Sequence, residues 1–198
     1  MPVAAFALIV GGGLWIALWR TRWRRWGLVP VAIGALWAFA TPAPDLIVTG
    51  DGRHLALRAQ TGAMAILRPR AGDYVRDMLI EASGEEGEMP ALEDMPAARC
   101  SRDLCAADIV RDGRTWRLLV TRTRDFVDFA PLSRACAEAD IVVSDRRLPR
   151  TCVPRWLKAD RALLRKTGGL AIVLGDPPRV ATVADRVGRH PWSERGAP

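Results

Sequence analysis

The first forty residues constrain the fold of this chain more than any other part of the sequence. They contain two uncharged apolar segments, residues 3–19 and 26–40, separated by the basic sequence RTRWRR at residues 20–25. These forty residues hold four Arg, no acidic residue and five of the eight Trp. Two apolar helices joined by a short basic loop, with Trp near their ends, are typical of a transmembrane hairpin.

As helices, the two segments would reach roughly 22–26 Å at about 1.5 Å per residue. We expect the flanking Trp and Arg to extend them toward the roughly 30 Å hydrocarbon core. Two alternatives fit less well. A signal peptide carries its basic residues before the apolar core, whereas here they follow it. A buried hairpin of a soluble protein would have to accommodate four Arg and five Trp around it.

The positive-inside rule predicts the orientation of such a hairpin. The Arg loop would stay in the cytoplasm, and the chain would be a multi-pass protein of the cytoplasmic (inner) membrane. Residues 41–198 would then be periplasmic or extracellular. The sequence TPAP at residues 41–44 is the predicted linker, because proline fixes φ and ends a helix.

Residues 41–198 have a different composition from the hairpin. They hold the other 25 basic residues and all 22 acidic residues, so their charges nearly balance. The net charge of +7 for the whole chain is therefore weak support for one basic, nucleic-acid-binding face. With His54 and His190 as the only histidines, a catalytic metal site built from several histidines is nearly excluded.

Periodicity predicts an α+β domain with more strand than helix over residues 45–187, followed by a loose tail at 188–198. Residues 45–49, 53–59 and 63–68 are expected to form a three-stranded meander. Residues 106–110 and 116–121 flank Asp112-Gly113 and predict a hairpin. The remaining predicted strands are 140–144, 170–174 and 179–183, and the predicted helices are 73–82, 132–139 and 160–166.

The four cysteines fall into two pairs along the sequence, and of the three possible connectivities we favour Cys100–Cys105 and Cys136–Cys152. The second bond would close a loop of about 15 residues and contribute on the order of 3 kcal/mol. A structural zinc site is the alternative, since the C-x4-C spacing is marginally acceptable for it. The second pair lacks ligand spacing, and free thiols are the third reading.

Asp51 and His54 lie together in the sequence TGDGRH and form a weak candidate site for a metal or a phosphate. A lone histidine on an alternating strand is more often a surface or packing residue. Gly50 and Gly52 predict a turn whether or not a ligand binds. The sequence contains neither a Walker loop nor a G-x-S-x-G elbow. No catalytic residue, metal ligand or cofactor is therefore assigned.

Arginines occur in clusters, and arginine binds phosphate in a bidentate manner. Trp116, Trp156 and Trp192 offer faces on which bases could stack. The candidate contacts to single-stranded DNA are Arg53, Arg58, Arg68, Arg70, Arg146, Arg147 and Arg150. Acidic residues are interleaved among them, so a solvated, arginine-rich surface is the alternative.

The order of several sequence phrases resembles ComEC-family competence proteins, which take up DNA. The likeness begins with the apolar segments, the Arg loop and TPAPDLIVTGDGRHLALR at residues 41–58. It continues in RAGDYVRDML, CSRDLC, ACAEADIVVSDRRLP, DRALLRKTGGLAIVLGDPPRV and GRHPW. The resemblance implies two N-terminal transmembrane helices followed by a shortened, degenerate metallo-β-lactamase-like (αββα) domain.

The sequence departs from that family at the metal site, because it contains no H-x-H-x-D-H motif. The chain also begins just before the last hairpin and resembles the C-terminal fragment of a longer protein. We therefore expect a membrane-anchored, non-catalytic fragment of a protein that transports single-stranded DNA across the cytoplasmic membrane. Expected partners are the membrane, single-stranded DNA, and the missing channel portion or other competence proteins. The alternatives are a metal-dependent hydrolase or nuclease using Asp51 and His54, and a structural periplasmic domain held by disulfides.

Overall fold

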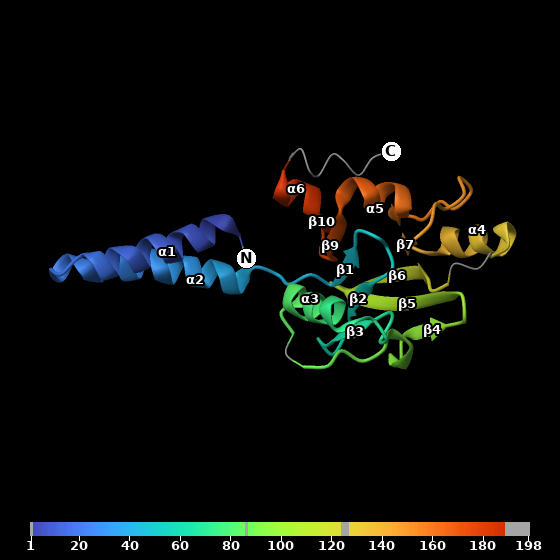
Figure 1. Ribbon diagram of the computed structural model, residues 1–198, viewed down its shortest axis with the longest axis horizontal. Helices are drawn as coiled ribbons and strands as arrows, with labels where there is room; N and C mark the ends of the chain where they lie inside the picture. Colours follow the sequence, from blue (N-terminus) through green and yellow to red (C-terminus); the bar gives the residue numbers. More distant parts are fainter. Residues whose placement is uncertain (1, 86, 124–126, 189–198) are drawn as a thin grey trace. The chain divides into compact units, whose positions relative to one another are not determined.

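The computed structural model of the chain describes residues 2–85, 87–123 and 127–188 (Figure 1). The chain divides into two compact units, Met1–Ala43 and Pro44–Pro198. The division falls within the linker predicted at residues 41–44. The predicted tail at 188–198 lies outside the described residues except for Gly188.

The first unit is a helical hairpin of α1 (Val3–Leu18), the 3₁₀ helix η1 (Arg22–Gly27) and α2 (Leu28–Ala40). Glycine allows its helices to approach closely. A Cβ placed on Gly12 would lie 2.6 Å from the carbonyl oxygen of Gly27, and one on Gly34 would lie 2.7 Å from that of Ala5. The hairpin therefore packs backbone against backbone at two levels.

The structure contradicts the predicted transmembrane hairpin. α1 has 16 residues and α2 has 13. Among the residues that the structure describes, no helix combines the length and the apolar character needed to cross a membrane. At about 1.5 Å per residue, α1 reaches roughly 24 Å, short of the roughly 30 Å hydrocarbon core. The predictions of two transmembrane helices and of a multi-pass inner-membrane location are therefore wrong, and the periplasmic or extracellular placement of the C-terminal domain loses the topology from which it was derived.

The local backbone explains why the expected extension of these helices fails. Trp19 leaves α1 in an extended conformation, and the basic sequence at residues 22–27 winds into the separate helix η1. The Trp and Arg side chains that were expected to lengthen the apolar helices thus belong to the connection between them. The indole nitrogen of Trp15 donates to the carbonyl of Trp23 at 3.1 Å and ties this connection to α1.

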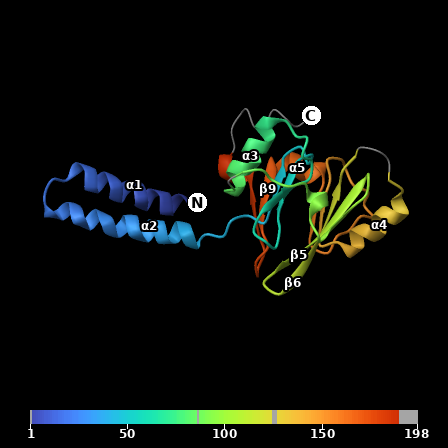
Figure 2. The same cartoon turned by 90° about the horizontal axis from the view of Figure 1, so that it is seen from below.

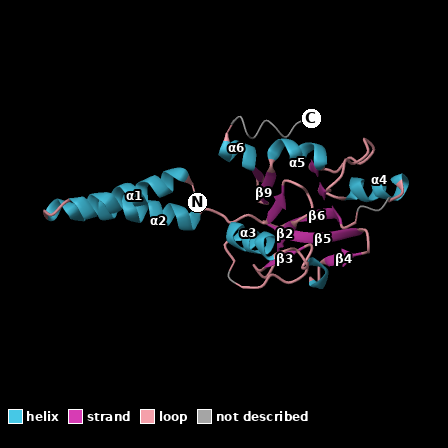
Figure 3. Cartoon of the chain, viewed as in Figure 1, coloured by secondary structure: helices cyan, strands magenta, loops and turns pink. Residues whose placement is uncertain are grey.

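The second unit contains two five-stranded sheets (Figure 3). The first sheet has the strand order β10-β9-β1-β2-β3 and is antiparallel throughout. Its strands are β1 (Leu46–Thr49), β2 (Leu55–Arg58), β3 (Met64–Ile66), β9 (Gly169–Val173) and β10 (Arg179–Thr182). The predicted meander is confirmed, and β9 joins it on the far side of β1.

The second sheet has the order β4-β5-β6-β7-β8. Its strands are β4 (Ala98–Cys100), β5 (Leu104–Arg111), β6 (Arg114–Thr121), β7 (Ile141–Val143) and β8 (Leu157–Ala159). The predicted hairpin is confirmed: β5 and β6 turn at Asp112 and Gly113, which both have positive φ, as a two-residue hairpin turn requires. Strands β6, β7 and β8 are parallel to one another, so their carboxyl ends meet at one edge.

Side chains that alternate along the strands bury the two sheets against each other. Leu46 and Val48 of β1 point into a large core that also takes Leu118 and Val120 of β6. Ile47, between the first two, belongs to a separate cluster on the outer face. This period of two is what a strand produces when both of its faces are covered.

Helices cover the outer faces of both sheets (Figure 2). α3 (Asp73–Ser83) buries Leu79 against the outer face of the first sheet. α4 (Phe129–Glu138) buries Leu132 and Cys136 against the outer face of the second. The unit is therefore an α+β domain with two sheets in its interior, and the two predicted helices at these positions are confirmed.

The end of the sandwich where β1 begins is closed by an ion pair between the sheets. The Asp45 carboxylate accepts hydrogen bonds from Nε of Arg111 at 2.7 Å and from the amide of Leu174 at 2.8 Å. The Arg111 guanidinium also donates to the carbonyls of Arg58 and Ala59. Since Asp45 is only 6% exposed, this contact joins the two sheets inside the protein rather than in solvent.

Among the described strands and α-helices, three have no counterpart in the sequence prediction. They are the short edge strands β4 and β8 and the helix α6 (Val183–Val187). Each has five residues or fewer, which is too short for a hydrophobic period to show. The predicted helix at 160–166 is confirmed as α5 (Arg161–Thr167), and the strand at 140–144 as β7.

Candidate functional site: a polar edge of the sandwich

Polar side chains gather where β1, β6 and β7 end. We call this group the polar edge, and its members are Thr49, Asp51, His54, Arg68, Thr121, Ser144 and Asp145. Because β6 and β7 are parallel neighbours, Thr121, the last residue of β6, and Ser144, which follows β7, lie at the same edge. The Thr121 hydroxyl donates to the Ser144 hydroxyl at 3.1 Å, and both residues are buried.

The β1–β2 turn packs directly on this edge. Gly52, at φ +68°, has no room for a side chain, because a Cβ there would lie 2.8 Å from the Ser144 carbonyl and 2.8 Å from a methyl group of Leu164. Leu164 belongs to α5. The Asp160 side chain caps the start of this helix by accepting hydrogen bonds from the amides of Ala162 and Leu163. The cap and the buried leucine of α5 thus hold the turn against the end of β7.

Hydrogen bonds inside the turn fix Asp51 and His54 relative to each other. The Asp51 carboxylate accepts hydrogen bonds from the Thr49 hydroxyl at 2.5 Å and from the Arg53 amide at 3.0 Å. The amide of His54 donates to the Thr49 hydroxyl at 3.1 Å. Sequence analysis named Asp51 and His54 as weak site candidates, and Thr49 is the residue that joins them.

The surroundings of these two residues change their pKa values. Burial opposes the charged form of Asp51, but the hydrogen bonds from Thr49 and Arg53 and the charges of His54 and Arg53 outweigh it and lower its pKa. Burial is the main cause that lowers the pKa of His54, and the charges of Arg68 and Arg53 add to it while Asp51 opposes them. We therefore expect a carboxylate beside a neutral imidazole at pH 7.

The structure brings part of the predicted arginine set to the polar edge. Arg53 and Arg68 are close enough to His54 to act on its charge. Arg68 also donates through Nη2 to the Arg122 carbonyl at 2.5 Å. Arg146 follows Asp145, and its amide donates to the Ser144 hydroxyl at 3.3 Å. The next residue, Arg147, is exposed.

The other predicted DNA contacts lie elsewhere. Arg58 ends β2 at the opposite end of the sheet, where its guanidinium pairs with Glu85 at 2.6 Å and donates to three backbone carbonyls. These contacts occupy Arg58 in the fold. Arg70 and Arg150 are exposed in two different connections, β3–α3 and β7–β8.

Trp116, one of the tryptophans suggested for base stacking, is not available for that role. Trp116 is 2% exposed, packs edge-on against Trp156, and is covered by the Arg114 guanidinium 3.9 Å from its ring centre. A base therefore has no access to its face. Trp192 and His190 lie outside the described residues.

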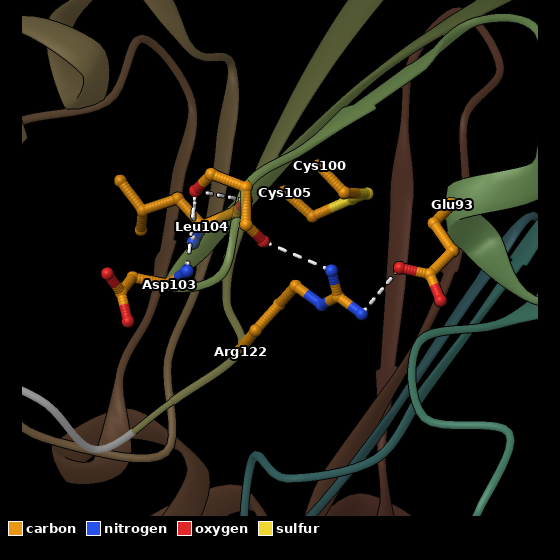
Figure 4. The surroundings of a disulfide bond; sticks show 7 residues. Glu93, Cys100, Asp103, Leu104, Cys105 and Arg122 are labelled. Carbon is orange, nitrogen blue, oxygen red and sulfur yellow. Dashed lines mark hydrogen bonds and ion pairs between the residues drawn. A yellow bond between two sulfur atoms is a disulfide. The ribbon is translucent and has the colours of Figure 1, made fainter.

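The cysteines are paired as the sequence favoured. Cys136 of α4 is bonded to Cys152 in the β7–β8 connection, and both are completely buried. Cys100 of β4 is bonded to Cys105, its direct partner in the register with β5 (Figure 4). All four cysteines are used in these bonds, which removes them as zinc ligands and as free thiols.

Over residues 2–85, 87–123 and 127–188, no cluster of three or more His, Cys, Asp or Glu side chains is arranged to hold a metal ion. Asp51 and His54 thus come together without a third such ligand in the described part of the chain. The polar edge contains the aspartates Asp51 and Asp145, the neutral imidazole of His54 and three hydroxyls, with guanidinium groups beside them. The guanidinium groups can hold an anion by charge-assisted hydrogen bonds.

No family model, no curated protein and no solved structure matches this chain. The resemblance to ComEC-family proteins thus rests on the sequence phrases alone. Neither a role in competence nor the name metallo-β-lactamase-like gains support from the comparisons.

Four residues of the polar edge were missed from the sequence: Thr49, Thr121, Ser144 and Asp145. Their only sequence signal is that Thr121 and Ser144 each end an apolar run. That signal becomes informative once β6 and β7 are known to be parallel. The parallel pairing itself depends on contacts between segments more than twenty residues apart.

Proposed function

We propose that the unit Pro44–Pro198 is a non-catalytic domain that binds single-stranded DNA at its polar edge. The observation that carries the proposal is the gathering of Arg53, Arg68 and Arg146 around the β1–β2 turn and the end of β7. Their guanidinium groups would bind the phosphate backbone, and the ComEC resemblance favours single-stranded DNA as the source of those phosphates.

The polar edge has properties suited to a phosphate backbone. Hydrogen bonds within the turn satisfy one oxygen of the Asp51 carboxylate, so its charge is already partly balanced. A neutral His54 adds no charge and offers a ring nitrogen for a hydrogen bond. Charge-assisted bonds from arginine to phosphate are the stronger kind, so affinity should depend on the arginines.

The test is a titration of a fluorescent single-stranded oligonucleotide with the full chain at two salt concentrations. For single strands, the logarithm of the binding constant falls with the logarithm of salt concentration by about 0.7 per phosphate contact. We expect salt-sensitive binding, and we expect Arg53→Gln and Arg146→Gln each to reduce that slope by about 0.7.

Arg179→Gln is the matched control for these variants. Arg179 is exposed and lies opposite Val173 in the register with β9, whereas the polar edge is at the Gly169 end of that strand. We expect this variant to bind as the unchanged chain does. Equal losses in all three variants would reject the polar edge as the site, and no binding at low salt would reject the function.

A structural role is the second candidate, favoured by the two disulfides and by the buried Asp45–Arg111 pair. A domain stabilised in this way can serve as a rigid module without binding a nucleic acid. Complete absence of DNA binding, together with a cooperative unfolding transition, would favour this role over the first.

A further inference from the structure

The two disulfides lie in very different surroundings. Cys136 and Cys152 are both 0% exposed, within the cluster under α4. Cys105 is also buried, at 1% exposed, but its partner Cys100 is partly exposed on β4, a three-residue strand at the edge of its sheet. A thiolate must reach a sulfur atom to reduce a disulfide, so exposed disulfides are reduced before buried ones.

The partly exposed Cys100–Cys105 disulfide lies at the base of a short turn that holds Arg122 (Figure 4). Within the turn, Ser101 and Leu104 bond to each other through backbone and hydroxyl groups. The turn accepts two hydrogen bonds from Arg122. The Arg122 amide donates to the Asp103 carbonyl at 2.8 Å, and Nη1 donates to the Ser101 carbonyl at 3.0 Å.

Arg122 connects this turn to the polar edge. Its carbonyl accepts a hydrogen bond from the Arg68 guanidinium, and the charge of Arg68 lowers the pKa of His54. Its own guanidinium pairs with Glu93 of the 3₁₀ helix η2 (Leu92–Asp94) at 2.7 Å. An unbroken series of contacts therefore runs from the Cys100–Cys105 bond through Arg122 to Arg68.

We propose that the Cys100–Cys105 disulfide is a thiol-sensitive control on the polar edge. With the bond formed, the turn at residues 101–104 holds Arg122, and Arg122 holds Arg68 in place to bind an anion. With the bond reduced, β4 and the turn are held to β5 by hydrogen bonds alone, without a covalent link, and the support of Arg68 loosens. This inference rests on the proposed function, because the polar edge supplies the binding that the bond would control.

The reductant is a dithiol. One of its thiolates attacks a sulfur of the Cys100–Cys105 bond, which breaks that bond and forms a mixed disulfide. The second thiolate of the dithiol then displaces the protein sulfur. The dithiol leaves as a cyclic disulfide, oxidised by two electrons, and its two protons are left on the Cys100 and Cys105 thiols.

The first experiment measures the order of reduction in the full chain. The folded protein is treated with increasing dithiothreitol, free thiols are alkylated, and peptides are quantified by mass spectrometry. We expect Cys100 and Cys105 to be alkylated at dithiol concentrations that leave Cys136 and Cys152 bonded. Simultaneous modification of all four cysteines, or earlier modification of the buried pair, would overturn the proposal.

The second experiment compares the oxidised and selectively reduced chain in the oligonucleotide titration. We expect reduction to weaken binding about fivefold or more, the lower end of typical couplings between two sites. The double variant Cys100→Ser/Cys105→Ser should bind the oligonucleotide as weakly as the reduced chain does, and dithiothreitol should not change its affinity. Equal affinity of the oxidised and reduced chains would overturn the control.

Hydrogen exchange separates failure of the control from failure of the DNA-binding function. The Arg122 amide is bonded to Asp103, so its exchange should accelerate on selective reduction, whether or not DNA binds. If neither form binds DNA, the proposed function is rejected. Unchanged Arg122 exchange would then reject the link from the disulfide to the polar edge as well.

Discussion

The carbonyl oxygen of Ser144 occupies the space into which a side chain at Gly52 would extend, 2.8 Å from the Cβ position. A turn from one sheet is thereby seated on the end of a strand in the other. Because Gly52 has no side chain and tolerates a φ of +68°, the polar edge depends on glycine at this position.

Replacing Gly52 by alanine should destabilise the domain. The new Cβ would meet Ser144 and Leu164, and it would also be strained at positive φ. We expect a loss of about 2–4 kcal/mol in the free energy of unfolding, from the left-handed backbone and from overpacking together. Urea denaturation measures it. Gly62→Ala is the control, since Gly62 has φ +93° but nothing within 4 Å of its Cβ position. Equal losses would show that the contact with Ser144 contributes nothing.

The cap of α5 should stabilise the same region. Asp160 accepts two amides of the first turn, from Ala162 at 3.0 Å and Leu163 at 3.2 Å. We expect Asp160→Ala to lower the free energy of unfolding by about 1–2 kcal/mol, the usual effect of losing an N-cap. Asp160→Asn keeps an acceptor oxygen and should retain most of the stability. Thermal unfolding of both variants checks the prediction, and an asparagine variant as weak as the alanine variant would contradict it.

His54 should titrate below its ordinary value of 6.5, because burial lowers its pKa. In that pH range the unfolded chain binds a proton that the folded chain does not. Stability therefore falls as the pH drops from about 6.5 toward the folded pKa, and it is retained at higher pH. Asp51 changes stability in the same direction at lower pH. Its pKa is lowered from 3.8, so stability is lost as the pH falls and that carboxylate is protonated.

NMR titration of the His54 ring tests this electrostatic arrangement, with His54→Gln to assign the signal. Arg68→Gln should raise the pKa of His54, because the Arg68 charge lowers it. Asp51→Asn should lower that pKa further, because the Asp51 charge raises it. Shifts of the opposite sign would mean that these side chains do not face His54 in solution.

The two disulfides should contribute unequally to stability. Cys136 and Cys152 are 16 residues apart in sequence, and Cys100 and Cys105 are five apart. Loop-closure entropy predicts about 3 kcal/mol for the longer loop and about 2 kcal/mol for the shorter one. Guanidinium unfolding of Cys136→Ala/Cys152→Ala and Cys100→Ala/Cys105→Ala measures the difference. A greater loss in the second variant would contradict the entropic account.

Local patterns in the sequence predicted much of the second unit. The run at 140–144 was expected to be a buried strand, and β7 is covered on one face by the main core and on the other by α4. Asp112 and Gly113 marked their hairpin, and the cysteine spacing favoured the observed pairs. In each case the signal lies within a few residues or in a spacing.

What the sequence did not predict depends on distant contacts or on where a helix stops. The parallel arrangement of β6 with β7 brings Thr121 to Ser144, and no local pattern encodes it. Arg58 and Arg53 look alike in sequence, yet Arg53 precedes β2 and Arg58 ends it, so they lie at opposite ends of the sheet. The hairpin was expected to span a membrane because its apolar runs were counted with their flanking Trp, whereas α1 ends at Leu18.

The Asp45–Arg111 contact makes the end of the sandwich where β1 begins sensitive to mutation. One carboxylate there joins strands from both sheets, so a substitution at that end disturbs several partners at once. The folded architecture is thus anchored at the end that carries no proposed ligand. Exposed residues at the opposite end, such as Arg53 and Arg147, can be exchanged to alter binding while the anchor keeps the sheets together, which makes this domain a suitable scaffold for engineering new anion specificity.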